Sequence, residues 1–283
     1  MKPRRTLLFA PGNRTEVHAK ALAAGADVVC LDLEDAVPPH LKDEARAQAI
    51  PFLVPGAGPE RAVRINSPRS ATGLRDLLAV IEARPAAGVV FLPKVTSGEE
   101  VRWVDELLTE AGLDLSLAVL IESVVGLENV SSILTASPRI AFAMFGGADL
   151  SAELGVPLED RPLLYARSRV VHAAKLAGID VFDVPSLAFR DLDQVAAEAA
   201  VARRLGFTGK GVLHPSNVGP VNHAFSPGDA EIAQAERIMA AYRESPTGLA
   251  VVDGKLVERP VIRAMERILA LREIISTDSR MDE

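Results

Sequence analysis

The sequence has little cysteine and histidine and no long apolar run, so it lacks the means for disulfides, zinc sites and membrane spans. Its 283 residues include one cysteine, Cys30, and five histidines. One cysteine cannot form an intrachain disulfide, so we expect a reducing, cytoplasmic environment. No histidine stands in an H-x-H or H-E-x-x-H pattern, which argues against a zinc site. No apolar run approaches the ~18 residues that span a membrane, and the first apolar run is too short for a secretion signal.

Positive charge is also scarce. Lysine and arginine number 31 against 38 aspartates and glutamates, which gives a net charge of −7. This balance argues against a basic nucleic-acid-binding protein. An acidic surface repels anions, so an anionic substrate would need local Arg, Lys or a metal ion. Apolar residues make up 48% and charged residues 24%, which is the composition of a globular protein with a large core.

Short apolar segments alternate with longer amphipathic ones. We expect strands at Thr6–Ala10, Asp27–Leu33, Ala62–Asn66, Gly88–Pro93, Leu115–Glu122, Ile140–Gly146, Asp180–Pro185 and Gly211–Leu213. Helices are expected at Arg14–Ala24, His40–Phe52, Gly73–Ala83, Gly98–Glu110, Gly126–Leu134, Arg161–Ala177 and Asp191–Leu205. Such alternation predicts a parallel sheet covered by helices, and eight units predict an α/β fold of the closed (β/α)8 TIM-barrel type. A doubly wound sheet is the competitor, but the first turn, Pro11-Gly12-Asn13-Arg14, lacks its G-x-G-x-x-G.

The pattern changes after the eighth strand. Residues 214–229 are rich in Pro, Gly, Ser and Asn and indicate a long loop, followed by helices at Ala230–Arg243 and Pro260–Ile275. Between them, Leu249–Val257 resembles a hairpin around Asp253-Gly254. The tail from Ser276 is polar and is expected to fray. We therefore expect a barrel domain over residues 1–225 and a C-terminal helical extension over 226–283, which either pads the rim or contacts a neighbouring subunit.

Charged residues follow the expected strands at their C-terminal ends, where parallel barrels carry their active sites. They are Asp32, Glu34 and Asp35 after the second strand, Arg64, Lys94 and Glu122 on the third to fifth, and Asp149 after Gly146-Gly147. Glu122 and Asp149 lie one β-α-β step apart, so they are expected on adjacent strands. Two neighbouring carboxylates repel each other unless a proton or cation intervenes. Hard oxygen ligands favour Mg2+, whereas the alternative is an ion pair of Glu122 with Arg64 or Lys94.

The two cations of the rim have alternative interpretations as well. Arg64 suits bidentate carboxylate binding, or it pairs with Glu34 or Asp35. Lys94 suits an enolate or a Schiff base, but a Schiff base needs a depressed pKa. Because carboxylates crowd this rim, we expect Lys94 to stay charged and favour the metal route.

Seven motifs in order give the chain a family resemblance over nearly its whole length. They are RRTLLFAPGNR, VVCLDLEDAVPPHLKDEAR, AVRINSP, FLPKV, LIESVVGLEN, FGGADLSAELG and GKGVLHPSNVGPVNHAFSP. The chain resembles the citrate lyase beta-subunit family within the HpcH/HpaI aldolase group. This resemblance implies a (β/α)8 barrel, often trimeric, that cleaves carbon–carbon bonds of 3-hydroxy-3-carboxyacyl thioesters with Mg2+.

The resemblance also implies roles for individual residues. Glu122 and Asp149 resemble the metal ligands, and Arg64 resembles the group that binds the substrate carboxylate, with Glu122 also facing the substrate. Lys94 matches a lysine near the substrate. The loop Pro11, Gly12, Asn13 and Arg14 matches one that lies by the phosphates of the thioester carrier. Asp32, Glu34 and Asp35 match an acidic motif behind the metal.

The chain departs from the family at one position. Related malyl- and citramalyl-thioester lyases carry an aspartate in the C-terminal segment, delivered from a neighbouring subunit as acid or base. Here Glu258 takes that place, one methylene longer, either as a catalytic group or as a surface residue. The resemblance implies cleavage of a citryl-type thioester, bound to CoA or an acyl-carrier protein, to oxaloacetate or another 2-oxo acid and an acetyl thioester. The alternatives are a stand-alone malyl-CoA or citramalyl-CoA lyase or thioesterase, and a barrel that binds 2-oxo acids without catalysis.

Overall fold

The computed structural model describes residues 3–244 and 250–281. The chain divides into two compact units. The first contains residues 4–222, and the second contains residues 223–283 together with residues 1–3. No helix within the described ranges is long and apolar enough to cross a bilayer.

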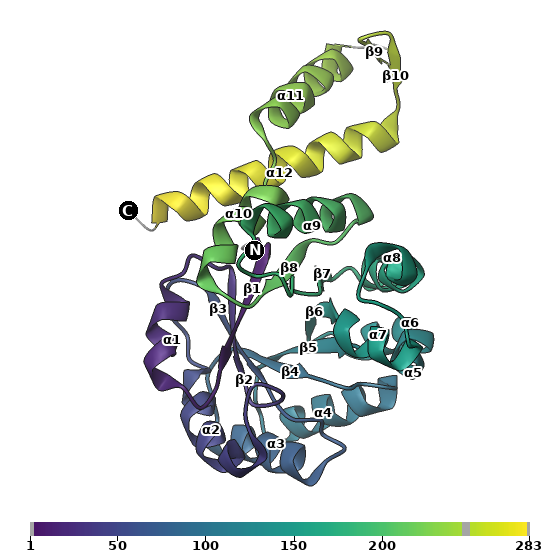
Figure 1. The fold of residues 1–283 in the computed structure, drawn as a ribbon. Helices are drawn as coiled ribbons and strands as arrows, with labels where there is room; N and C mark the ends of the chain where they lie inside the picture. The colour runs from purple at the N-terminus through teal and green to yellow at the C-terminus, as the bar shows by residue number, and fades with distance from the viewer. Residues whose placement is uncertain (1–2, 245–249, 282–283) are drawn as a thin grey trace. The chain divides into compact units, whose positions relative to one another are not determined.

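Eight parallel strands of the first unit close into a barrel, in which each strand pairs with the next and β1 pairs with β8 (Figure 1). The strands are β1 (Thr6–Pro11), β2 (Val28–Asp32), β3 (Glu60–Arg64), β4 (Val89–Leu92), β5 (Ser116–Ile121), β6 (Ile140–Phe145), β7 (Asp180–Asp183) and β8 (Gly209–Val212). The predicted (β/α)8 TIM barrel is therefore confirmed.

Helices connect the strands and surround the barrel (Figure 1). They are α1 (Thr15–Leu22), α2 (Lys42–Ala49), α3 (Ala71–Ala83), α4 (Gly98–Glu110), α5 (Val124–Glu128), α6 (Val130–Leu134), α7 (Gly147–Leu154), α8 (Asp160–Ala177), α9 (Leu192–Leu205) and α10 (Val218–Phe225), with 3-10 turns η1 (Pro39–Leu41), η2 (Ile50–Phe52) and η3 (Pro215–Asn217). Helix α7 was not expected from the sequence.

The barrel interior is filled by alternate residues of the strands. Phe142 packs edge-to-face between Phe91 and Phe182, with ring centroids 5.7 and 5.1 Å apart. Because side chains alternate along a strand, the next inward positions after Cys30, Ala62 and Leu120 of this cluster fall on charged residues. These are Asp32, Arg64 and Glu122, which therefore lie above the apolar core at the C-terminal mouth of the barrel.

Serines begin three helices at that mouth. Ser70 and Ser123 accept hydrogen bonds from the N–H groups of Gly73 and Gly126, each at 3.0 Å, and Ser97 accepts from Glu100 N at 3.5 Å. Each cap satisfies an otherwise unpaired backbone donor and stabilises its helix by about 1 kcal/mol. The caps fix where the loops after β3, β4 and β5 turn into helices, and hence where their side chains lie.

The C-terminal unit contains α11 (Asp229–Glu244), the antiparallel strands β9 (Ala250–Val252) and β10 (Lys255–Val257), and α12 (Arg259–Met281). Its core is formed by Ile238, Met239, Val257 and Ile262. The hairpin prediction is confirmed for 250–257, and Leu249 lies outside the described residues.

One prediction for the C-terminal part of the chain is wrong. The expected loop over 214–229 contains η3 and α10. Pro215 lies in the first turn of η3, where a helix does not need the backbone N–H that proline lacks. Of the tail from Ser276, the residues up to Met281 form the last part of α12, and residues 282 and 283 lie outside the described residues.

Candidate active site

Glu122 and Asp149 meet at the barrel mouth. Glu122 directly follows β5 and is 4% exposed, and its Oε1 accepts the N–H of Lys94 at 2.6 Å. Asp149 lies in the first turn of α7, the helix that was not expected from the sequence, and its side chain is exposed. Both residues line one cavity, and Asp149 is close enough to Glu122 to raise its pKa. The two residues singled out as metal ligands are therefore brought together.

Gly146 makes this approach possible. A Cβ at this position would lie 2.3 Å from the Cβ of Glu122, closer than two carbon atoms can approach. Its N–H also donates to Ile121 O at 2.9 Å, which holds the end of β6 against β5. Glycine is thus required here for close backbone packing, and the packing positions the turn that carries Asp149.

The environment of Glu122 favours its protonated form. Burial, the hydrogen bond with Asp149 and the charge of Glu34 raise the pKa of Glu122 to about 9, against the opposing effects of the N–H and ammonium of Lys94. At neutral pH Glu122 is then protonated in the absence of a cation. Because the repulsion between neighbouring carboxylates favours this proton, a bound cation would be stabilised there in its place.

Arg64 is held by the acidic motif after β2. Its Nε and Nη2 donate to the two oxygens of the buried Asp32 at 2.7 and 2.6 Å, and Nη1 lies 3.2 Å from Glu34 Oε2. Although burial alone lowers the pKa of Arg64, these carboxylates raise it overall. The pairing with Glu34 that the sequence left open is present, and the bidentate partner is Asp32.

Glu34 lies between the two cations of the mouth. It is 5% exposed, with Oε1 3.3 Å from Lys94 Nζ, yet neither oxygen accepts a hydrogen bond of good geometry. Burial raises the pKa of Glu34. For Lys94, burial lowers the pKa but Glu34, Glu122 and Asp149 outweigh it, so the pKa is raised. Lys94 is therefore charged, as expected.

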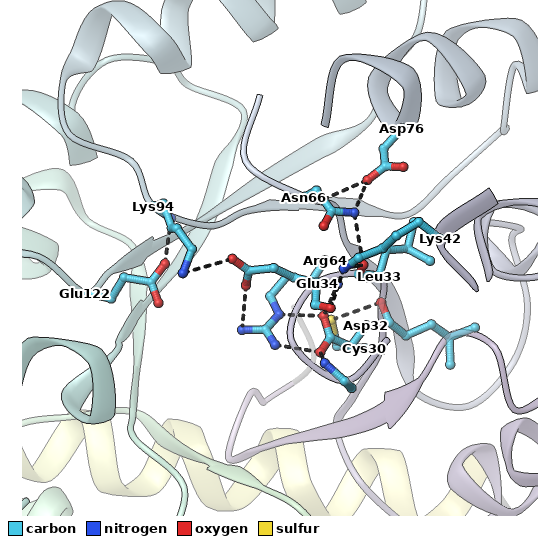
Figure 2. A network of polar contacts seen from close by, with 12 residues as sticks. Cys30, Asp32, Leu33, Glu34, Lys42, Arg64, Asn66, Asp76, Lys94 and Glu122 are labelled. Carbon is cyan, nitrogen blue, oxygen red and sulfur yellow. Dashed lines mark hydrogen bonds and ion pairs between the residues drawn. The ribbon is translucent and has the colours of Figure 1, made fainter. Parts of the chain in front are cut away.

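A hydrogen-bond network supports the loop that carries Glu34 (Figure 2). Lys42 Nζ donates to the carbonyls of Leu33 and Glu34, both at 2.6 Å. Asn66 Nδ2 donates to Leu33 O at 2.9 Å and to the buried Asp76 at 2.6 Å. The backbone of the acidic motif is thus fixed from two sides.

The remaining predicted residues are placed with fewer contacts. Asp35 is exposed, and no described residue forms a hydrogen bond or ion pair with its carboxylate. In the loop after β1, Gly12 N donates to Asp32 O at 2.8 Å, and Pro11 ends the strand. Asn13 Oδ1 is buried without a partner, and Arg14 is exposed and paired with Glu16 at 2.8 Å. Glu258 is exposed and precedes α12 in the C-terminal unit.

A cavity of about 540 Å³ opens over the carboxylate pair. Besides Lys94, Glu122 and Asp149 it is lined by residues that the sequence reasoning missed, namely Ser67, Arg69, Ser70, Thr96, Ser123 and Glu153. All but Glu153 lie in the first residues after β3, β4 and β5, so extending the search beyond the strand ends would have found them.

The donor set fits a small hard cation. Within the described part of the chain, no three His, Cys, Asp or Glu residues group as a metal site. Mg2+ needs fewer, because it takes one or two carboxylates and leaves its other positions to water and substrate. Glu122 and Asp149 supply two carboxylates, and no soft ligand is among the described residues that line the cavity. These residues therefore suit a magnesium ion.

The fold and this mouth define a (β/α)8 barrel whose opening brings several carboxylates together with arginine and lysine side chains, at the end where such barrels carry their active sites. The chain belongs to the HpcH/HpaI aldolase/citrate lyase family, whose model matches residues 5–215.

Individual relatives cover almost the whole chain. Mitochondrial citramalyl-CoA lyase of Mus musculus is 30% identical over 290 residues, covering 95% of this chain and 86% of its own. The (3S)-malyl-CoA thioesterase of Cereibacter sphaeroides is 35% identical over 281 residues, covering 97% and 96%.

Solved structures agree with the fold. Protein CitE from Mycobacterium tuberculosis, in complex with magnesium, acetoacetate and coenzyme A, is 31% identical with a TM-score of 0.79, over 95% of this chain and 97% of that one. The citrate lyase beta subunit of the same organism, complexed with oxaloacetate and magnesium, is 32% identical with a TM-score of 0.68, over 80% and 98%.

Proposed function

We propose that this protein is a Mg2+-dependent carbon–carbon lyase that cleaves a citryl-type thioester to a 2-oxo acid, oxaloacetate, and an acetyl thioester. The observation that carries the proposal is the meeting of the buried Glu122 and the exposed Asp149 at the barrel mouth that also holds Arg64 and Lys94. The relatives named above act on CoA thioesters, and two solved relatives hold magnesium.

Each residue of the mouth has a task in this reaction. Glu122 and Asp149 would hold the Mg2+, which when bound supplies Lewis acidity that lowers the pKa of a coordinated hydroxyl. Arg64, oriented by Asp32, would bind the substrate carboxylate through donors that Asp32 leaves unused. The charged Lys94 would stabilise negative charge beside it. Asp32 and Glu34 would support these groups from behind through their contacts with Arg64 and Lys94, and Asp35 would act on Lys94 through its charge.

The proposed cleavage is of the retro-Claisen type. A base removes the proton of the 3-hydroxyl, the oxygen forms the carbonyl of the 2-oxo acid, and the adjacent carbon–carbon bond breaks. Its electron pair passes to the acetyl thioester as an enolate, which then takes up a proton. We assign this proton to Glu258 of a neighbouring subunit, and we assign the carrier phosphates to the loop Pro11, Gly12, Asn13 and Arg14. The proposal thus includes a cytoplasmic homo-oligomer, a trimer, in which residues 226–283 contact the neighbour.

Turnover of defined thioesters tests the function. Purified protein is incubated with Mg2+ and citryl-CoA, malyl-CoA or citramalyl-CoA, and release of the 2-oxo acid is followed. Release that stops with EDTA and in Glu122→Gln supports the proposal. Release that persists without any divalent metal contradicts it. Light scattering after size exclusion gives the oligomeric state in the same preparation.

The thioesterase relative favours a second candidate, hydrolysis of a malyl-type thioester. A hydrolase releases free thiol without a 2-oxo acid, whereas the lyase releases the 2-oxo acid with the thioester intact. Measuring both products in one reaction separates the two. Binding of oxaloacetate with neither product would indicate a barrel that binds 2-oxo acids without cleaving them.

A further inference from the structure

The cavity over the carboxylate pair has walls of polar side chains. The described residues that line it are four with hydroxyl groups, three carboxylates and two cations, and no apolar side chain is among them. A wall that met a methyl group or a hydrogen atom of the substrate would gain from apolar contact. Hydroxyls and cations instead suit an acyl group that carries a further charged or hydrogen-bonding substituent.

The cations around this cavity differ in how far they are already paired. Arg64, which belongs to the barrel mouth but not to the residues that line this cavity, is bound by Asp32 and approached by Glu34, and its side chain is 13% exposed. Lys94 Nζ lies 3.3 Å from the buried Glu34. Both therefore balance carboxylates of the protein. Neither Arg64 nor Lys94 therefore has a positive charge left unbalanced that could pair with a further carboxylate of the substrate.

Arg69 is the more available cation. Its side chain is 62% exposed, and Nη1 donates to the neutral hydroxyl of Thr96 at 2.9 Å. Glu100 lies 3.7 Å from Nη1, a long contact that leaves little hydrogen bonding. Among the described contacts, Nε and Nη2 have no partner. These two groups form one edge of the guanidinium, the geometry that binds a carboxylate through two parallel hydrogen bonds.

The loop that carries Arg69 is held in place by contacts that do not involve the guanidinium group of Arg69. Ser70 N and Oγ both bond to Ser67 O, at 2.9 and 2.8 Å, and Ser70 caps α3. A Cβ on Gly73 would lie 2.0 Å from Ser67 O, so the loop is packed directly on the helix backbone. The bond to Thr96 then ties the side chain to the loop after β4, which extends the guanidinium along the cavity wall.

We infer that Arg69 binds a second carboxylate of the acyl group and thereby selects a dicarboxylic product, the oxaloacetate type, over pyruvate or glyoxylate. The inference rests on the lyase function proposed above and deepens it. A citryl group carries CH2–COO⁻ where a citramalyl group carries a methyl and a malyl group a hydrogen. The substituent that differs among these thioesters is therefore an anion in one case alone. Arg69 has the open hydrogen-bonding edge to recognise it.

The experiment compares kcat/KM for citryl-CoA, citramalyl-CoA and malyl-CoA in wild type, Arg69→Ala and Arg69→Lys. Arg102→Ala is the matched control, because Arg102 is an exposed arginine on α4 that pairs with Glu99 and does not line the cavity. Arg69→Ala should lower kcat/KM for citryl-CoA by about 10- to 30-fold, the effect of one charge-assisted contact at a half-exposed position. The other two thioesters should change by less than about threefold, and Arg69→Lys should recover part of the loss.

Equilibrium binding gives a readout independent of turnover. Calorimetric titration with oxaloacetate and with pyruvate, both with Mg2+, should show that Arg69→Ala weakens oxaloacetate and leaves pyruvate unchanged. Equal losses on all three thioesters, with oxaloacetate binding intact, would instead assign Arg69 to the carrier phosphates and overturn the inference. Unchanged values throughout would overturn it too. If wild type cleaves none of the thioesters, the lyase proposal fails, and oxaloacetate binding still decides the role of Arg69.

Discussion

Replacing Glu122 by glutamine tests whether the carboxylate pair is a metal site that holds a proton when the metal is absent. Glutamine keeps the shape of the side chain and an oxygen for the N–H of Lys94, which donates at 2.6 Å. It removes the negative charge that burial and the neighbouring carboxylates disfavour. The substitution should therefore act in opposite directions on the metal-free and metal-bound protein.

The magnitude follows from the pKa of Glu122. This pKa is about 9 in the folded protein against 4.5 for an ordinary glutamate, so the folded state keeps a proton that the unfolded state releases. Stability of the metal-free wild type must then fall as pH rises between these two values. Between pH 5 and pH 7.5 the loss is about 3 kcal/mol, or roughly 6 to 10 °C in Tm. Glu122→Gln should be free of this loss and be the more stable protein at pH 7.5.

Thermal and urea unfolding at pH 5 and pH 7.5, with EDTA or with Mg2+, measure both effects. Saturating Mg2+ at about 100 times its Kd should stabilise wild type by about 3 kcal/mol, with no gain in Glu122→Gln. Glu153→Gln is the control, because Glu153 lines the same cavity but is exposed. It should follow wild type under all four conditions.

One result would refute this reasoning. If metal-free Glu122→Gln is less stable than wild type at pH 7.5, then Glu122 is an ionised anchor for the loop of Lys94. The alternative of a purely structural ion pair would then hold, and the buried charge would contribute stability without any metal.

Three further predictions concern other residues of the proposed site. A lysine in place of Arg64 cannot form both hydrogen bonds to Asp32. Arg64→Lys should therefore lower the free energy of unfolding in urea by about 1–3 kcal/mol and lower kcat/KM at least tenfold. Unchanged turnover would show that Arg64 does not bind the substrate. Lys94 has a positive φ of 54°, so Lys94→Gly should relieve backbone strain and be more stable than Lys94→Ala by about 1 kcal/mol. Both variants lose the ammonium group and should turn over equally slowly. Faster turnover by Lys94→Gly would mean that the backbone N–H of this residue matters and its ammonium group does not. Glu258→Gln should leave the Mg2+-dependent Tm shift unchanged and lower kcat, and an unaltered kcat would make it a surface residue.

The fold was predictable because strands such as β2 and β4 are apolar runs that are buried on both faces. The strand that was placed least well is β8, expected at Gly211–Leu213 and found at Gly209–Val212. A Cβ on Gly209 would lie 2.6 Å from Arg4 O, and one on Gly211 would lie 2.7 Å from Met144. These glycines are required by close packing inside the barrel. From sequence alone a glycine indicates a turn, since the crowding comes from other strands.

The site was predictable to the extent that it follows the ends of strands. Asp32, Arg64 and Glu122 continue the inward alternation of β2, β3 and β5, so their convergence follows from the period of two. The placement of Glu34 between Arg64 and Lys94 does not follow from it, because it depends on a loop held by Lys42 and Asn66. Helix α7, which carries Asp149, begins at Gly147, and glycine is a poor helix former.

The charges of the mouth explain why the same residues cost stability and provide function. The carboxylates of Asp32, Glu34, Asp35, Glu122 and Asp149 outnumber the cations Arg64 and Lys94 at the mouth. This excess of negative charge favours the binding of a divalent cation. Without it, the folded protein reduces the excess by holding a proton on Glu122, since carboxylates this close cannot all ionise. Metal binding must displace that proton, so affinity for Mg2+ should rise with pH below about 9. The burial that makes the metal-free site unfavourable is thus what makes the cation bind. Because Arg64 and Lys94 already balance carboxylates of the protein, a second carboxylate of the substrate has to be met by another cation, and Arg69 lines the same cavity.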